Sequence, residues 1–246
     1  SGCVVKATEL RFHVLGDNPD DFPEVAASNA TKTDDSITLK SADLVDMVRR
    51  THFAAAIEKA RYRYAISGIL VDAHESRFRL VAMDGKRLAL AERSLAQPLK
   101  SAVFAVVPTK ALTLIQRLLA EGEESIRLRV LKNELQVQTL RATISARLIE
   151  GHFPPYEDLL PRTLEKKLEL PRKPFMGALR RTALLTTRES SAVRFKFGKD
   201  GLEMTARVPE VGEWRVHFAL DFPYGDLENG FNPLYLIDAL KVIDGD

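Results

Sequence analysis

The sequence has little cysteine, little tryptophan and no long hydrophobic run. Its single cysteine, Cys3, excludes an internal disulfide and a zinc site built from several cysteines. No stretch of about 18 apolar residues is present, so no transmembrane segment is predicted. The opening Ser1–Lys6 lacks the basic and apolar regions of a signal peptide. Together these absences predict a cytoplasmic protein.

Motifs typical of catalysis are also missing. The sequence contains no Gly-x-x-x-x-Gly-Lys-Ser/Thr phosphate loop, no Gly-x-Ser-x-Gly elbow and no His-Glu-x-x-His zinc motif. Its five histidines stand singly, and an isolated histidine is more often structural than a metal ligand or a base. We expect no enzyme activity, no metal and no cofactor, with an enzyme of unfamiliar active site as a weaker alternative.

The overall charge gives no sign of a nucleic-acid partner. The chain carries 36 Lys and Arg against 34 Asp and Glu, a net charge of +2, so any DNA contact must come from basic residues gathered on one surface. A hydrophobic content of 45% and a charged content of 28% are ordinary for a soluble globular protein. The length of 246 residues suits about two domains.

A hairpin near residue 84 is the clearest local pattern. Apolar residues alternate along Phe78–Met83, as in a strand, and Leu88 and Leu90 resume the alternation. Between them, Asp84-Gly85 is typical of a two-residue type I′ turn. Alone, this pattern predicts a surface hairpin.

Parts of the chain repeat each other. Arg49-Arg50-Thr51 recurs as Arg180-Arg181-Thr182, and Phe22-Pro23 recurs as Phe153-Pro154, in both cases 131 residues later. Helices that start at a proline are predicted near Pro108 and again at Pro233, 125 residues apart. Matches in the same order at nearly the same offset indicate an internal repeat.

The repeat predicts the domain organisation. We expect the end of one unit in residues 1–30, a complete unit in 36–161 and part of a third in 162–246. Each unit is α+β, with two helices packed on antiparallel sheets. Equal repeats would need about 95 more residues before Ser1 and about 40 after Asp246, so we expect a chain truncated at both ends.

Three motifs carry a family resemblance. They are Val81-Ala82-Met83-Asp84-Gly85-Lys86-Arg87-Leu88-Ala89, Ala146–Tyr156 and Gly230–Leu236. They resemble the central hairpin, the end of the second domain and the start of the last helix in the bacterial DNA polymerase III β subunit, the sliding clamp. The resemblance implies a DNA-clamp fold and a homodimeric ring around duplex DNA. It also implies a processivity factor that tethers the replicative polymerase, the clamp loader and other clamp-motif proteins. The alternative is a truncated or degenerate paralogue that acts as a non-ring peptide-binding or structural module.

Basic residues on or beside the predicted helices are the candidates for DNA contact. By themselves, such residues could simply face solvent and complement the helix dipole. The resemblance instead implies that they contact phosphates in the channel without reading bases. In the loop Arg61-Tyr62-Arg63-Tyr64, basic and aromatic residues interleave, as in surfaces that track a nucleic-acid strand. The candidates are Arg49, Arg50, Arg61, Tyr64, Lys110, Arg117, Lys173, Arg180 and Arg181.

The resemblance also implies a groove that takes a short apolar peptide and a joint between ring subunits. Ordinary core packing is the alternative for both sets. Met83 and Asp158 depart from the family pattern and the last strands of the third domain are not in the chain, so we expect weak or absent peptide binding. The predicted groove residues are Arg63, Ile66, Gly85, Lys86, Arg87, Leu88, Pro154 and Leu159, and the predicted joint residues are Phe12, Leu184 and Leu185.

Overall fold

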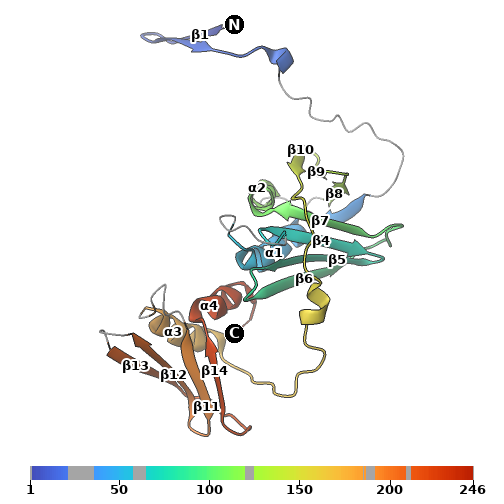
Figure 1. Ribbon diagram of the computed structural model, residues 1–246. Helices are drawn as coiled ribbons and strands as arrows, with labels where there is room; N and C mark the ends of the chain where they lie inside the picture. Colours follow the sequence, from blue (N-terminus) through green and yellow to red (C-terminus); the bar gives the residue numbers. More distant parts are fainter. Residues whose placement is uncertain are drawn as a thin grey trace. The chain divides into compact units, whose positions relative to one another are not determined.

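The computed structural model describes residues 2–21, 36–57, 65–119, 125–184, 186, 192–208 and 212–245. The chain divides into two compact units, Ser1–Asp35 and Ser36–Asp246. In the first unit, β1 (Gly2–Lys6) pairs antiparallel with β2 (Arg11–Leu15), and a 3-10 turn follows at Pro19–Asp21 (Figure 1). Both strands are exposed along their length, so the described part of this unit holds no buried core.

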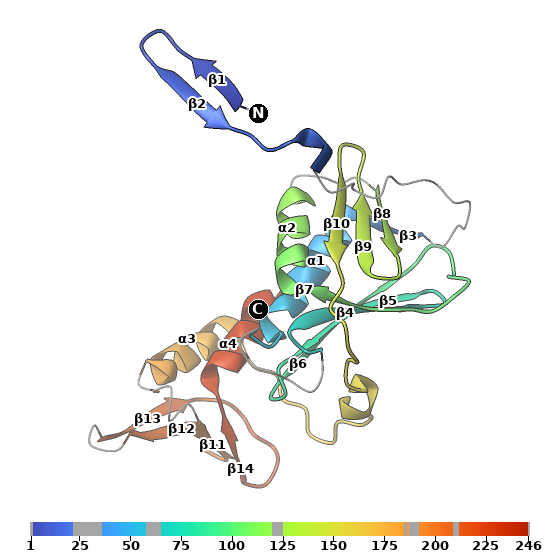
Figure 2. The ribbon, with the colours of Figure 1, turned by 45° about the horizontal axis from the view of Figure 1, so that its top comes forward.

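The second unit begins with two antiparallel sheets and two helices. Its first elements are β3 (Ile37–Lys40), α1 (Ser41–Thr51), a 3-10 turn (His52–Ala54), β4 (Gly68–His74), β5 (Arg77–Met83), β6 (Leu88–Ser94), β7 (Val103–Pro108), α2 (Thr109–Leu119), β8 (Ser125–Val130), β9 (Glu134–Gln138) and β10 (Thr143–Arg147). The strand orders are β6-β5-β4-β7 and β10-β9-β8-β3. Buried residues recur at helical spacing on α1, at Leu44, Met47 and Val48, and on α2, at Leu112 and Ile115. These side chains join both sheets in one core, with α1 and α2 side by side (Figure 2).

The second half of this unit holds one more sheet and two more helices. Its elements are a 3-10 turn (Tyr156–Leu159), α3 (Arg172–Ala183), β11 (Val193–Gly198), β12 (Gly201–Val208), β13 (Gly212–Phe218), β14 (Leu227–Phe231) and α4 (Pro233–Val242). Phe175, Leu179, Phe195, Met204 and Ile237 are buried together in a second core. None of the helices in the described residues is long and apolar enough to cross a membrane.

The two halves share the arrangement of one helix, one sheet and a second helix, as the internal repeat predicts. In each, a helix precedes four antiparallel strands, and a second helix follows them, directly after Pro108 in the first half and at Pro233 in the second. The strand orders β6-β5-β4-β7 and β13-β12-β11-β14 are the same arrangement, with the fourth strand beside the first. Before α4, Asn232 caps the helix by accepting a hydrogen bond from the Leu234 amide at 2.9 Å, and Pro233 occupies the first turn.

The central hairpin forms as predicted, but its turn is displaced by one residue. Met83 pairs with Leu88, and the Asp84 amide donates to the Arg87 carbonyl at 3.3 Å, so the two-residue loop is Gly85-Lys86. Gly85 has a φ of +84°, whereas Asp84 does not have a positive φ. A type I′ turn at Asp84-Gly85 would need a positive φ at both residues, so the expected turn does not form. Asp84 instead caps the turn, because its Oδ1 accepts from the Lys86 amide at 2.9 Å.

One face of the β6-β5-β4-β7 sheet packs on α1, and the segment after β10 covers part of the other face. Successive side chains on a strand point to opposite faces. Ile69 and Val71 on β4 therefore join the helical core, whereas Leu70 packs with Tyr156 and other residues of the segment after β10. We call this second face the outer face of the sheet. Asp72, two residues from Leu70, lies on the same outer face.

Candidate functional site

Arg49 and Arg50, two predicted DNA contacts at the end of α1, are held by carboxylates. The Arg49 Nη2 atom lies 2.6 Å from Asp46 Oδ1, and the Arg50 Nε atom lies 2.7 Å from Asp46 Oδ2. Both guanidinium groups also pair with Asp244, and Arg93 donates to Asp46 at 2.7 Å. Burial raises the pKa of the Asp46 carboxyl, but hydrogen bonds from Arg49 and Arg50 outweigh this effect and hold the pKa below its ordinary value. The charge of the two arginines is therefore partly balanced within the protein.

The remaining predicted DNA contacts are mostly on exposed helix surface. Arg61 and Tyr64 lie outside the described residues. The others are exposed on α2 and α3: Lys110, Arg117, Lys173, Arg180 and Arg181. Contacts with a polyanion need charge and not a fixed geometry, so exposed basic side chains on the helices of both halves suit such a partner.

Arg87, a predicted groove residue, joins the two halves of the second unit. Its Nη1 donates to Asp238 Oδ2 on α4 at 2.9 Å, and its Nη2 donates to the Phe53 carbonyl at 2.7 Å. The Nε atom lies 3.1 Å from Asp84 Oδ2. The guanidinium carbon lies 4.3 Å from the centroid of the Tyr235 ring, a cation–π contact. With 20% of the side chain exposed, this charge is partly desolvated and matched by two carboxylates.

The partners of Arg87 on α4, Asp238 and Tyr235, are contacts that the sequence did not predict. Asp238 is the one acidic residue in the largely apolar helix Pro233–Val242. A lone carboxylate on such a helix indicates a specific basic partner, because an unpaired charge is costly to bury. That pattern could have drawn attention to Asp238, although nothing in the sequence selects Arg87 as its partner.

The predicted groove contains a small apolar cluster. Ile66 is buried with Ala56 and Met83, and Leu88 and Phe153 pack against them. Met83 thus supplies part of the apolar surface at the position where it departs from the family pattern. An apolar cluster at a surface suits the anchoring of a few apolar side chains.

The other predicted groove residues are less enclosed. Gly85 and Lys86 are exposed at the hairpin turn, and Pro154 is half-buried. Leu159 is 59% exposed at the end of its 3-10 turn. Arg63 lies outside the described residues. The structure therefore brings Ile66 and Leu88 into one cluster. Gly85, Lys86 and Leu159 are exposed to solvent.

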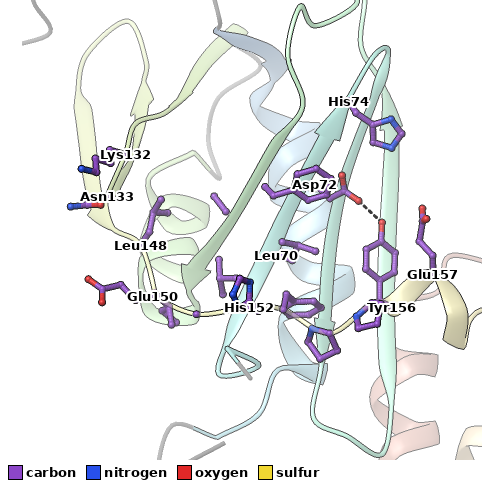
Figure 3. A pocket seen from close by; sticks show the side chains of 18 of the residues that line it. Leu70, Asp72, His74, Lys132, Asn133, Leu148, Glu150, His152, Tyr156 and Glu157 are labelled. Carbon is purple, nitrogen blue, oxygen red and sulfur yellow. Dashed lines mark hydrogen bonds between the residues drawn. The ribbon is translucent and has the colours of Figure 1, made fainter. Parts of the chain in front are cut away.

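A buried polar network lies on the outer face of the sheet. The Tyr156 hydroxyl donates to Asp72 Oδ2 at 2.5 Å (Figure 3). It also accepts from Arg79 Nη1 at 3.1 Å. Arg79 also reaches Glu92 at 2.5 Å and Glu157 at 2.8 Å. Burial raises the pKa of Tyr156 to about 12, and the hydrogen bond to Asp72 acts in the same direction. The network fixes the segment after β10 on the sheet.

The predicted joint residues carry exposed apolar side chains. Phe12 on β2 is 58% exposed, and Leu184, directly after α3, is 82% exposed. Leu185 lies outside the described residues. In the described part of the chain, no group of three or more His, Cys, Asp or Glu side chains is arranged to hold a metal ion.

Comparison with known families matches most of the chain. Residues 38–155 match the central domain of the DNA polymerase III beta subunit, and residues 157–246 match its C-terminal domain. The two matched ranges meet between Pro155 and Glu157, close to the boundary between the two halves of the fold.

Known proteins resemble the chain along nearly its whole length. A beta sliding clamp of Pseudomonas putida is 30% identical over 240 residues, which are 98% of this chain and 64% of that protein. A beta sliding clamp of Chlamydia muridarum is 29% identical over 94% of this chain and 61% of that protein. The crystal structure of the DNA polymerase III subunit beta from Pseudomonas aeruginosa superposes with a TM-score of 0.89 at 29% identity, covering 99% of this chain and 66% of that one. The chain thus spans slightly less than two thirds of the length of these relatives.

Proposed function

Since the chain belongs to the DNA polymerase III β subunit family, we propose that it acts as a DNA sliding clamp. In this role it encircles duplex DNA as part of a ring and tethers the replicative polymerase, the clamp loader and other clamp-motif proteins. The role is non-catalytic. The observation that carries the proposal is the similarity to beta sliding clamps over 98% of the chain. It favours this role over that of a degenerate module, because both halves match the family.

In the proposed domain arrangement, residues 1–30 are the end of a first clamp domain, 36–161 form the second and 162–246 form part of the third. The shared topology of the two halves supports this assignment. A ring is joined by a homodimer contact in which Phe12 packs against Leu184 and Leu185 of a second copy. The exposure of Phe12 and Leu184 supports that contact, because large apolar side chains gain most from being covered.

The proposed DNA contact is electrostatic and independent of sequence, as sliding requires. The strongest contributors are the exposed residues Arg117, Arg180 and Arg181. Among the described residues, no ion pair joins them to a carboxylate, whereas Arg49 and Arg50 both pair with Asp46. A peptide groove around Ile66 and Leu88 holds partner proteins. Arg87 lies between the two halves of the second unit and forms the polar edge of this groove.

Charge removal on α3 tests the DNA contact. We expect the double substitution Arg180→Ala and Arg181→Ala to weaken binding to linear duplex several-fold at low ionic strength, because two phosphate contacts are lost. The matched control is Arg141→Ala together with Arg147→Ala, which removes two exposed arginines from the β9–β10 hairpin. Equal weakening by both pairs would mean that only net charge matters and would remove α3 from the contact.

A further inference from the structure

We propose that a cavity on the outer face of the β6-β5-β4-β7 sheet binds an organic cation, a guanidinium or amidinium group carried on an apolar body. The cavity has a volume of about 660 Å³, within the range of small-molecule sites. Strands β4 and β7 form its floor, and the segment after β10 forms its wall (Figure 3). It touches the predicted peptide groove at Phe153 and Pro154 but lies beyond it on the sheet. The proposal stands independently of the clamp role.

The first observation is a buried carboxylate oxygen that lacks a partner. Asp72 lines the cavity, is 3% exposed, and uses its Oδ2 atom to accept from Tyr156. Its Oδ1 atom has no hydrogen-bond partner among the described residues. Arg79 is directly opposite Asp72 on β5, but its guanidinium group is turned to Glu92, Tyr156 and Glu157. A buried polar atom without a hydrogen-bond partner raises the free energy of the folded protein. A ligand that donates a hydrogen bond to Oδ1 removes this penalty, which favours binding.

The second observation is an exposed aromatic ring beside this carboxylate. Phe104 is directly opposite Asp72 on β7, which places the two side chains next to each other on the outer face. Phe104 lines the cavity and is 64% exposed, so a ligand in the cavity can contact its ring. A cation between the two would contact an aromatic face and a carboxylate at once. This combination selects a planar cation with several N–H donors.

The remaining lining residues determine the chemistry of the rest of the ligand, to which the cationic group is attached. Part of the cavity is apolar and can hold an apolar body beside the guanidinium group. The residues that form this part are Leu70, Val106, Leu148 and Ile149. Apart from Tyr156, the ionisable residues that line it are four carboxylates, two basic residues and two histidines: Asp72, Glu150, Glu157, Asp158, Lys132, Arg147, His74 and His152. Two of the carboxylates already have basic partners, since Glu157 pairs with Arg79 and Glu150 lies 3.9 Å from Arg147. The surplus of negative charge favours a cationic ligand.

Benzamidine is the first probe, because its amidinium group is attached to a flat apolar ring. We expect titration of the ¹⁵N-labelled full chain to give saturable NMR shifts at the amides of Asp72, Phe104 and the segment after β10. Benzamide, the neutral isostere, should give none. Benzamide binding as tightly as benzamidine would overturn the proposal, because the site would then not recognise charge.

Variants identify the contacts. Asp72→Asn should weaken benzamidine binding about tenfold or more, the loss expected for a hydrogen bond to a charged group. Phe104→Leu keeps an apolar side chain at an exposed position and should weaken binding a few-fold by removing the aromatic face. Asp221→Asn removes an exposed carboxylate that does not line the cavity and should change nothing. Unchanged affinity in both Asp72→Asn and Phe104→Leu would overturn the assignment, and Phe104→Leu alone decides it if Asp72→Asn does not fold.

A second probe separates a free small cation from an arginine side chain of a partner. It is the blocked tripeptide Leu-Arg-Leu, with citrulline in place of arginine as its neutral control. Shifts with benzamidine alone assign the site to small cations, and shifts with the arginine peptide alone assign it to a partner's side chain. Absence of shifts with both probes would overturn the proposal.

Discussion

At the scale of single residues, Arg87 shows what sequence reasoning can and cannot reach. Its place beside a hairpin turn follows from local pattern, since Asp84 and Gly85 mark the turn. Its ion pair with Asp238 joins residues 151 positions apart, and no periodicity or motif links them. Long-range pairs depend on how the two halves pack, so they emerge only in the folded structure.

The bonds of Arg87 predict a measurable coupling between the two halves. We expect Arg87→Ala to lower the free energy of unfolding by about 2 kcal/mol, because it removes a charged hydrogen bond to Asp238 and the cation–π contact with Tyr235. In a double-mutant cycle by chemical denaturation, Arg87→Ala and Asp238→Ala should be non-additive by about 1 kcal/mol. The control, Arg141→Ala at an exposed position, should stay within about 0.5 kcal/mol of the parent. Strict additivity of the first pair would contradict the coupling.

Asp46 predicts a pH dependence of stability. Its pKa is lower in the folded protein than its ordinary value of 3.8, because hydrogen bonds from Arg49 and Arg50 outweigh the opposing effect of burial. Its stabilising effect is therefore present above that ordinary value and is lost as the pH falls through the lower folded pKa. Asp46→Asn should reduce the free energy of unfolding by about 1 kcal/mol near neutral pH, and the difference should vanish as the pH falls through the lowered folded pKa. A difference that persists unchanged into strong acid would show that the carboxylate charge is not the cause.

At the scale of elements, the helices were predictable, one strand was overlooked and one carried no signal. The helices α1 to α4 carry regular apolar spacing, and α4 carries the Asn232-Pro233 start signal. Strands β13 and β14 were not predicted. In β13 the signal was present and overlooked, because Trp214, Val216 and Phe218 alternate with polar residues and pack on the second core. In β14 all side chains are exposed, so burial does not impose an alternation on its sequence. The turn of the central hairpin was misassigned by one residue because Asp-Gly suits more than one turn type.

Gly85 tests the turn geometry. Gly85→Ala should destabilise the protein by about 1 kcal/mol, because an L-residue is strained at a φ of +84°. A Cβ at this position would meet no atom within 4 Å, so backbone strain is the whole effect. Gly225 offers a matched control, since a Cβ there also meets nothing within 4 Å and its φ lies outside the left-handed region. Thermal or chemical unfolding of both alanine variants should separate them, and equal stability would argue against backbone strain at Gly85.

At the scale of the whole molecule, the repeat links sequence to function. The recurrence of Arg49-Arg50-Thr51 at Arg180-Arg181-Thr182 was visible in the sequence, and the shared strand order gives it a structural basis. The sequence could not show that the two arginine pairs differ in surroundings. Arg49 and Arg50 pair with Asp46 and Asp244, whereas Arg180 and Arg181 are exposed.

The proposed ring joint predicts the mass in solution. Light scattering at several concentrations should give a mass that rises from monomer towards dimer, and Leu184→Asp should shift it back towards monomer. Leu140→Asp is the matched control, because Leu140 is 86% exposed and Leu184 82%, yet Leu140 is not among the predicted joint residues. A mass that both substitutions reduce equally would remove Leu184 from the joint.

The central claim, a clamp-type contact with DNA, is tested most directly by equilibrium binding to two linear duplexes of equal length and unrelated sequence across a range of salt concentrations. A clamp contact is electrostatic and does not read bases. We expect equal affinities for the two duplexes and a steep, matching decline of both as the salt concentration rises. Binding that prefers one sequence by tenfold or more, or that does not respond to salt, would contradict it.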